Sequence, residues 1–400
     1  MDGNTASPST DILPFELTEQ QREIRDAIQR IMADFDDDYW LETDRTANYP
    51  HEFRKAIAAG GWLGICMPEE VGGAALGITE AMVMMEAVAN TAGAQTAASS
   101  IHLNIFGPNV LVKYGTESQR QTFLPPIISG ELMTSFGVTE PDAGLDTTQI
   151  KTFARRDGDD YVINGRKIWN SCAQQANRIL LLTRTEEAGK GNKRADGMTL
   201  FFCELDRSKI EIREIPKMGR HAVNSNMLFI DDLRVPASDV VGEVGRGFYQ
   251  LLDGLNPERI LISGELVGIG RQAIARATQY AKDREVFGRP IGMNQSIQHP
   301  LAHSWMELES SWLAALQAAR LYDAGRPCGA EANMAKYLAA EAGFKACERA
   351  VLTHGGMGYA QEYHVERLFR EVQIGRLAPV SQQLISCFIA ERVLGLPRSY

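Results

Sequence analysis

Hydrophobic residues in the first third of the chain recur at the spacing of an α-helix. Ile24 and Ile28 fall on one helical face. Ahead of them, Thr18 and Gln21 form the pattern of a capping box, in which each side chain bonds the other residue's backbone. Residues 79–93 predict a second, fully buried helix. The chain is therefore predicted to be helical to about residue 130.

The pattern changes between about residues 131 and 240, where short runs rich in β-branched and aromatic residues are separated by turn signals. Asp157-Gly158 and Asn164-Gly165 predict hairpin turns, because both dipeptides tolerate positive φ. Several short strands with such turns favour a small barrel or sandwich. From about residue 241 helical spacing returns and continues to the end.

These patterns predict an α+β multidomain protein. We expect an N-terminal α-helical domain over residues 1–130, a middle β-barrel or β-sandwich domain over residues 131–240, and a C-terminal four-helix bundle over residues 241–400. No repeat of 20–50 residues is visible, which argues against a solenoid.

Composition narrows the function classes. The chain has 400 residues, 44% hydrophobic and 23% charged, as is usual for globular proteins. Its formal net charge is −10 and no long basic run offsets it, so a nucleic-acid or anionic-membrane surface is not expected. No stretch approaches the roughly 18 apolar residues of a membrane span.

Cysteine and histidine spacing gives no sign of a metal. The six cysteines include no CxxC pair. His299 and His303 have i,i+4 spacing, but Pro300 lies between them and no third ligand completes a site, so we expect no metal. The first 16 residues lack the apolar stretch of a secretory signal. Together with free cysteines, this predicts a reducing, cytoplasmic location.

Five motifs in order carry a family resemblance that spans nearly the whole chain. They are MPEEVGG at 67–73, FGVTEPDAGLD at 136–146, YVINGRKIWNS at 161–171, DREVFGRPI at 283–291 and HGGMGYAQEYHVERLFRE at 354–371. With these motifs the chain resembles the acyl-CoA dehydrogenase family. The resemblance implies FAD, a CoA thioester substrate, dehydrogenation across Cα and Cβ, a homotetramer, and an electron-transfer flavoprotein as electron acceptor.

The resemblance also implies a flavin site with two halves. One half, from the middle domain, would contact the isoalloxazine through Phe136, Val138, Thr139, Trp169 and Ser171. Trp169 would give the ring an apolar wall, and Ser171 could bond near N5.

The other half would come from the C-terminal domain of a neighbouring subunit. An Arg offers a planar fork to pyrophosphate oxygens, and glycines allow close backbone approach. The matching residues are Arg284, Phe287, Gln295, Gly355 and Gly356. Ser381 and Gln383 match further flavin-contacting positions. Two positions depart from the family. Leu145 replaces a Ser that contacts the pyrophosphate and is assigned here to the substrate side of the site, and Leu352 stands where a Gln is common.

The catalytic base is the most informative position. Many family members carry it in a YEGT-like segment, but gapless alignment from Arg370 places Pro379 there. Isovaleryl-CoA and long-chain dehydrogenases instead use an earlier segment like LDLERL, which here reads LNPERI and carries Glu258. A carboxylate suits α-proton removal, and an apolar pocket would raise its pKa toward neutral. We therefore expect Glu258 to be the base and Arg259 to lie near the substrate.

Alternatives remain open at this point. Glu258 could be a surface or helix-N-terminal carboxylate, with Pro257 in the first helical turn. Pro379 also lacks the backbone N–H that, in the family, donates to the thioester carbonyl. The chain could therefore be a redirected flavoenzyme on the same fold: an enoyl-CoA reductase, a desulfinase-like lyase or a flavin-dependent oxygenase. It could also be a non-catalytic partner subunit of a hetero-oligomer.

Overall fold

The computed structural model describes residues 17–188 and 193–399. The first 16 residues, on which the expectation about a secretory signal rests, lie outside them. Within the described ranges, no helix is both long enough and apolar enough to cross a membrane.

The N-terminal part is helical, as its periodicity predicts. Its helices are α1 (Glu19–Met32), α2 (Asp37–Thr46), α3 (His51–Ala59), α4 (Ile78–Ala89), α5 (Ala94–Phe106), α6 (Asn109–Tyr114) and α7 (Glu117–Ile128). The capping box at Thr18 is confirmed: Gln21 N donates to Thr18 Oγ1 at 3.2 Å, and Thr18 N donates to Gln21 Oε1 at 3.1 Å. The helix predicted over 79–93 is real and buried but ends at Ala89, where Asn90 to Gly93 turn the chain into α5.

The middle part is one hydrogen-bonded sheet of eight strands in the order β6-β7-β3-β2-β4-β5-β8, with β1 beside β4. The strands are β1 (Thr134–Gly137), β2 (Phe153–Asp157), β3 (Asp160–Ser171), β4 (Arg178–Arg184), β5 (Met198–Glu204), β6 (Ile210–Glu214), β7 (Ser225–Pro236) and β8 (Val240–Val241). β1 runs parallel to β4, and β3 is antiparallel to both β2 and β7.

One of the two predicted hairpin turns is wrong. The chain does turn after Asp157, with Asp157 paired to Asp160 and Gly158 at φ +64°. Asn164-Gly165 instead lies inside β3, where the register with β7 shifts between Ile163 and Gly165. Between these pairs β7 has two residues opposite the single Asn164 of β3, so the extra residue lies on β7. Position 165 has no room for a side chain, because a Cβ there would come within 2.4 Å of Thr152 Oγ1.

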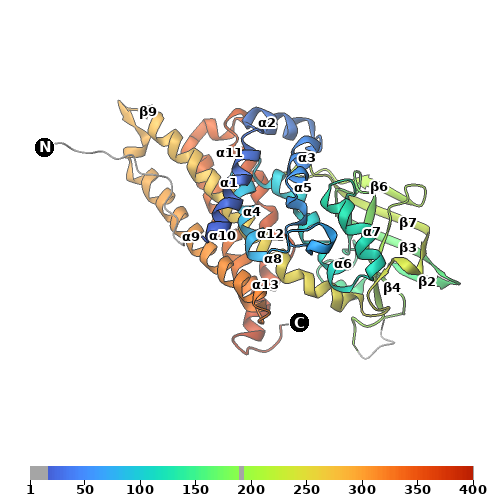
Figure 1. The fold of residues 1–400 in the computed structure, drawn as a ribbon. Helices are drawn as coiled ribbons and strands as arrows, with labels where there is room; N and C mark the ends of the chain where they lie inside the picture. The colour runs from blue at the N-terminus through green and yellow to red at the C-terminus, as the bar shows by residue number, and fades with distance from the viewer. Residues whose placement is uncertain (1–16, 189–192, 400) are drawn as a thin grey trace.

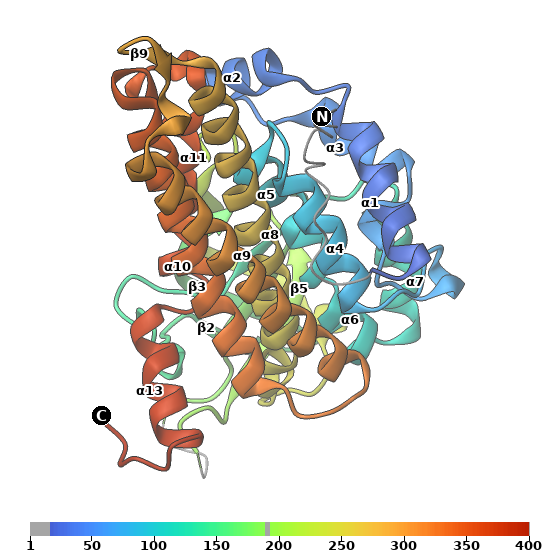
Figure 2. The ribbon, with the colours of Figure 1, turned by 90° about the vertical axis from the view of Figure 1, so that its left-hand side faces the viewer.

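The C-terminal part returns to helices. They are α8 (Gly247–Asp283), α9 (Gln295–Asp323), α10 (Gly329–His354), α11 (Val365–Val372), α12 (Ile374–Leu377) and α13 (Gln382–Arg392), with a hairpin of β9 (Glu285–Val286) and β10 (Arg289–Pro290) between α8 and α9. Short 3₁₀ turns occupy 62–64, 69–71, 147–149, 237–239, 291–293, 355–359 and 361–363. Helices α8, α9 and α10 lie side by side (Figure 2).

The three parts form the helix–sheet–helix order expected, so the predicted fold class is confirmed. The last N-terminal helix ends at Ile128 and the first strand begins at Thr134, while β8 ends at Val241 and α8 begins at Gly247. The division at 1–130, 131–240 and 241–400 fits these limits and stays a proposal. The sheet lies at one end of the molecule and the β9–β10 hairpin at the other (Figure 1).

Close packing of α4 against α8 fixes the helix that carries Glu258. Both helices contribute to the largest hydrophobic core. A Cβ at Gly264 would come within 2.8 Å of Met82, and one at Gly268 within 2.5 Å of the Glu86 carbonyl oxygen. These glycines therefore let the two helices approach more closely than side chains would allow.

Candidate functional site

Glu258 lies in the middle of a long helix, not at the start of one. Helix α8 begins at Gly247, eleven residues earlier, and continues through Pro257 to Asp283. The helix-N-terminal alternative for Glu258 is therefore wrong, as is the placement of Pro257 in a first turn. The side chain is half-buried. Burial raises the pKa of Glu258 to about 7, although His102 and Arg259 act to lower it.

Two cations, Arg259 and Lys336, act electrostatically on this carboxylate. Lys336 of α10 is buried and donates from Nζ to the Val380 carbonyl oxygen at 2.6 Å. Burial and the positive charge of Arg259 lower the pKa of Lys336 to about 8, while Glu258 acts to raise it. Lys336 thus connects the segment after Pro379 to the surroundings of Glu258. At position 379 itself, proline offers no N–H to a ligand.

Arg259 has one partner and one unsatisfied donor. Its Nη1 donates to Asn256 Oδ1 at 3.0 Å. Its Nε is buried without a hydrogen-bond partner in the part of the chain that the structure describes. Burial lowers the pKa of Arg259, and the Glu258 carboxylate counters that effect. The expected place of Arg259 beside the substrate stays a prediction.

The residues expected to face the isoalloxazine come together on β1, the segment after it, and β3. Asn170 Nδ2 donates to the Phe136 carbonyl oxygen at 2.7 Å, and Ile168 N donates to the Thr139 carbonyl oxygen at 2.9 Å. Lys167 Nζ reaches the Val138 carbonyl oxygen at 3.0 Å. These bonds fix the 136–139 segment against β3.

A buried ion pair also holds the segment after β1 against β3. Lys167 Nζ lies 2.9 Å from Glu140 Oε1, and Lys167 is fully buried. Glu140 also accepts from the backbone N–H groups of Lys151 and Thr152 at 2.6 and 3.0 Å. Removing one partner of such a pair leaves an uncompensated buried charge, which is strongly destabilising. The pair therefore anchors the strand segment expected to border the flavin.

Trp169 combines an exposed side chain with an unusual backbone conformation. Its φ is +64°, rare for a bulky side chain, and it sits where the register between β3 and β7 shifts. The indole is 56% exposed. Ser171 follows on the same strand, and its carbonyl oxygen accepts from Ser135 Oγ at 2.9 Å. An exposed indole beside backbone groups fixed in place fits an isoalloxazine ring.

The second group of expected flavin residues lies at the opposite end of the molecule. Arg284 ends α8, and Phe287, at φ +55°, projects fully exposed from the β9–β10 hairpin. Gln295 begins α9, and Gly355 and Gly356 follow α10 in an exposed turn. Leu352, where the family often has Gln, is also exposed.

The two groups lie far apart within a single chain. Glu258 and Arg284 are 26 residues apart on or at the end of α8, which corresponds to about 39 Å along the helix axis. Figure 1 shows the sheet and the hairpin at opposite ends. This separation is compatible with the expectation that two subunits share each flavin, which stays a proposal.

Three further expected site residues, Ser381, Gln383 and Leu145, lie outside these two groups. Ser381 caps α13, where its Oγ accepts from Leu384 N at 3.2 Å, so this hydroxyl already has a structural role. Gln383 is exposed on the first turn of that helix. Leu145 is exposed in the loop after β1 and far in sequence from Glu258.

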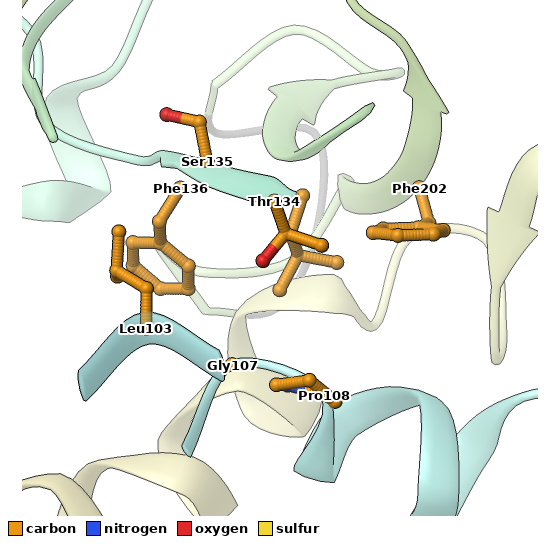
Figure 3. A pocket seen from close by; sticks show the side chains of 8 residues that line it. Leu103, Gly107, Pro108, Thr134, Ser135, Phe136 and Phe202 are labelled. Carbon is orange, nitrogen blue, oxygen red and sulfur yellow. The ribbon is translucent and has the colours of Figure 1, made fainter. Parts of the chain in front are cut away.

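Two small apolar pockets border α5, and neither was visible in the sequence. In the first, Thr134 and Phe136 of β1 point toward α5 while Ser135 points away (Figure 3). The second is lined by Phe106, Phe136, Leu251, Gly254 and Leu255, so it ends about one turn of α8 before Glu258. Sequence reasoning also missed His102, Glu265 and Lys336. The only sequence signal was the i,i+7 spacing of Glu258 and Glu265, which places both on one helical face.

Models of one protein family match almost the whole chain. The N-terminal, middle and C-terminal domains of acyl-CoA dehydrogenase match residues 18–131, 135–233 and 245–394. The acyl-CoA dehydrogenase FadE12 of Mycobacterium tuberculosis is 37% identical over 389 residues, covering 96% of this chain and 98% of that protein.

Two further matches bear on function. A 3-(aryl)acrylate reductase of Clostridium sporogenes is 34% identical over 355 residues, covering 88% of this chain and 93% of that protein. The structure of butyryl-CoA dehydrogenase from Megasphaera elsdenii superposes with a TM-score of 0.90 at 27% identity, covering 96% of this chain and all of that one.

The raised pKa of Glu258 predicts a pH-dependent stability effect. The group has a pKa of about 7 in the folded protein against 4.5 as its ordinary value, so the folded state binds the proton more tightly. Stability from this group is therefore lost as pH rises from about 4.5 to about 7. Glu258→Gln should leave the Tm unchanged near pH 4.5 and raise it at pH 8.5, measured by thermal unfolding.

The exposed Glu131 provides a matched control. Glu131→Gln should shift the Tm by the same small amount at both pH values. An equal effect of Glu258→Gln at pH 4.5 and pH 8.5 would contradict a raised pKa at position 258.

Proposed function

The chain belongs to the acyl-CoA dehydrogenase family of FAD-dependent enzymes, and on that premise we propose that Glu258 is its catalytic base. The reaction is the α,β-dehydrogenation of an acyl-CoA thioester. FAD, when bound, would supply the acceptor for the hydride that leaves Cβ. Glu258 takes the proton that leaves Cα, and the electron pair of that C–H bond becomes the new Cα–Cβ double bond.

The observation that carries this proposal is the half-buried carboxylate in the middle of α8, with a pKa of about 7. A base is most effective when its pKa is near the working pH. Position 379, where many family members have the base, is a proline. The pocket lined by Gly254 and Leu255 comes directly before Glu258 on α8. An acyl group that enters along α8 would therefore meet the Glu258 carboxylate at the end of this pocket.

The other residues act by binding and orientation. Trp169, Ser171 and the 136–139 backbone would border the isoalloxazine, and Arg284 and Phe287 of a second subunit would hold the remainder of the FAD. Arg259 would contribute its free Nε–H on the substrate side. This arrangement supports a pair of chains in which each gives one half-site and receives the other, and from the family resemblance we propose that two such pairs form a homotetramer.

The same residues also support the reverse reaction as a second candidate. The similarity to a 3-(aryl)acrylate reductase favours it, as does Pro379, which removes one backbone donor for a thioester carbonyl. A carboxyl with a pKa of about 7 is partly protonated at neutral pH, so Glu258 could return a proton to Cα as readily as it accepts one. Direction would then depend on the electron partner.

We further propose an electron-transfer flavoprotein as the electron acceptor and a cytoplasmic location. The acceptor is proposed because each oxidation of a thioester releases two electrons that must leave the enzyme. The location rests on six cysteines without a disulfide among the described residues.

Replacing the base should separate chemistry from cofactor binding. Glu258→Gln should keep FAD bound but slow flavin reduction by a reactive acyl-CoA about 10²–10⁴-fold, because an amide cannot accept the proton. In the wild type, the reduction rate should rise with pH to a plateau above about 7, as the carboxyl loses its proton. Anaerobic rapid-mixing absorbance spectroscopy measures both effects.

Asp253→Asn is the matched control, since Asp253 is a half-buried carboxylate on the same helix that pairs with Lys113 at 2.6 Å. It should reduce flavin at close to the wild-type rate. If Glu258→Gln is as fast as this control, the proton is taken by another group. The reductase candidate is favoured instead if chemically reduced enzyme is reoxidised by an enoyl-CoA while saturated thioesters leave the oxidised flavin unchanged.

A two-subunit flavin site predicts complementation between variants. Trp169→Glu and Arg284→Glu should each abolish FAD binding when present in every chain, because each introduces a negative charge into one half-site. In a mixed pair of subunits, one site combines both lesions and the other has neither. Co-expressed, differently tagged chains should therefore recover FAD in about half of the sites of mixed pairs.

Arg289→Glu, on the second strand of the same exposed hairpin, controls for charge reversal alone and should retain FAD. The flavin absorbance per chain is the readout. Mixed assemblies without FAD, or a monomer that binds FAD, would show that the two groups of residues do not share a site.

A further inference from the structure

Beyond Glu258, the facing surfaces of α5 and α8 change from apolar to polar. On α5, Phe106, His102, Ser99 and Gln95 are spaced i, i+4, i+7 and i+11 and form one stripe. Phe106 lines the pocket that Leu255 of α8 also lines. Farther along both helices, His102, Ser99 and Gln95 replace the apolar residues.

Glu265 is the centre of this polar region. It is 1% exposed and lies seven residues after Glu258 on the same face of α8. His102 Nδ1 is 2.5 Å from Glu265 Oε1, and Gln95 Nε2 donates to Glu265 Oε2. Burial alone would lower the pKa of His102, but the Glu265 carboxylate outweighs burial and raises it. Such a pair is costly to bury and adds little stability by itself.

Two polar atoms around Glu265 have no hydrogen-bond partner among the residues that the structure describes. The Oε1 atom of Gln95, a residue 1% exposed, is buried and accepts no hydrogen bond from any described residue. The second ring nitrogen of His102, Nε2, has no hydrogen bond within the described ranges. His102 packs on Phe106 with 4.9 Å between ring centroids, so the imidazole adjoins the pocket wall.

Arg220 adds an unpaired cation to the same region. Its Nη1 donates to Ser99 Oγ at 3.1 Å. Of the carboxylates in residues 17–188 and 193–399, none lies within ion-pair distance of it. Burial lowers the pKa of Arg220, and Glu371 and Glu265 counter that effect from farther away. The region thus offers donors from Arg220 and His102 and a free acceptor on Gln95.

We infer that this polar region is a subsite for a hydroxyl group at the end of the acyl chain remote from the thioester. The inference rests on the proposed function, in which the acyl group lies beside Glu258. A hydroxyl can donate to Gln95 Oε1 and accept from His102 or Arg220. An ammonium group would meet two cations, and a carboxylate could not donate to Gln95 and would face the charge of Glu265.

The spacing of the two glutamates sets the length of the acyl group. Seven residues of α-helix correspond to about 10 Å, and an extended chain gains about 1.2 Å per bond, from about 3.6 Å per three-bond residue. About eight bonds therefore separate Cα from the subsite. Hydroxyacyl thioesters of about six to ten carbons are the class to test.

The test compares matched thioesters on the FAD-loaded tetramer. The probes are hexanoyl-, octanoyl- and decanoyl-CoA, their ω-hydroxy derivatives, and the ω-carboxy derivatives of the same lengths. Calorimetry in the Glu258→Gln background gives each Kd without turnover. At one length or more, the ω-hydroxy member should bind at least about tenfold more tightly than its alkyl partner, because it satisfies groups that an alkyl end leaves unpaired.

Gln95→Met keeps the side-chain length but removes the acceptor, and should reduce that preference to less than about threefold. Asn104→Leu is the matched control: it also replaces an amide on α5, but nine residues from Gln95 and so on the opposite helical face. It should leave the preference unchanged.

Three results would overturn the subsite. Alkyl thioesters could bind as tightly as their ω-hydroxy partners at every length, ω-carboxy thioesters could bind more tightly than the ω-hydroxy ones, or the preference for the hydroxyl could survive Gln95→Met. These outcomes are distinct from failure of the proposed function. If the dehydrogenase proposal is wrong, no thioester of any kind reduces the wild-type flavin. If only the subsite is wrong, alkyl thioesters reduce it and the hydroxyl brings no advantage.

Discussion

The account depends on the burial of one carboxylate in the middle of a continuous helix. Glu258 is held half out of water on α8, and burial brings its pKa to about 7. Helix α8 can hold it there because Gly264 and Gly268 let α4 pack closely against the same helix. The cations nearby, Arg259 and Lys336, keep the charged form accessible. A surface carboxylate would have neither property, and would stay ionised and solvated at neutral pH.

A second constraint is the separation of the two halves of the flavin site. The exposed Trp169 and the fully exposed Phe287 are apolar side chains at opposite ends of the molecule, each on backbone with positive φ. Exposure of large apolar groups in a single chain is unfavourable unless something covers them. The proposed assembly, with a second copy of the chain and FAD between the two groups, would cover both side chains.

The sequence was sufficient to predict structure where the residues that determine it are close together in the chain or form long motifs. The Thr18 capping box, the order of helices and strands, and the Trp169 strand could all be predicted from short segments. Prediction failed where distant packing decides. Asn164-Gly165 reads as a turn but lies inside β3, paired with β7, and Pro257 reads as a helix start but lies inside α8. His102 and Glu265 are 163 residues apart, so no local pattern could show that they form a pair beyond Glu258.

The most direct test of the central claim is whether Glu258 itself moves the α-proton. The measurement is deuterium exchange at Cα of 3-thiaoctanoyl-CoA, in which sulfur replaces the β-carbon so that no hydride can leave, followed by NMR in deuterated buffer with the FAD-loaded protein. The account predicts exchange by the wild type that increases with pH through about 7, and loss of exchange in Glu258→Gln with ligand binding retained. Exchange by Glu258→Gln at the wild-type rate would show that another group is the base.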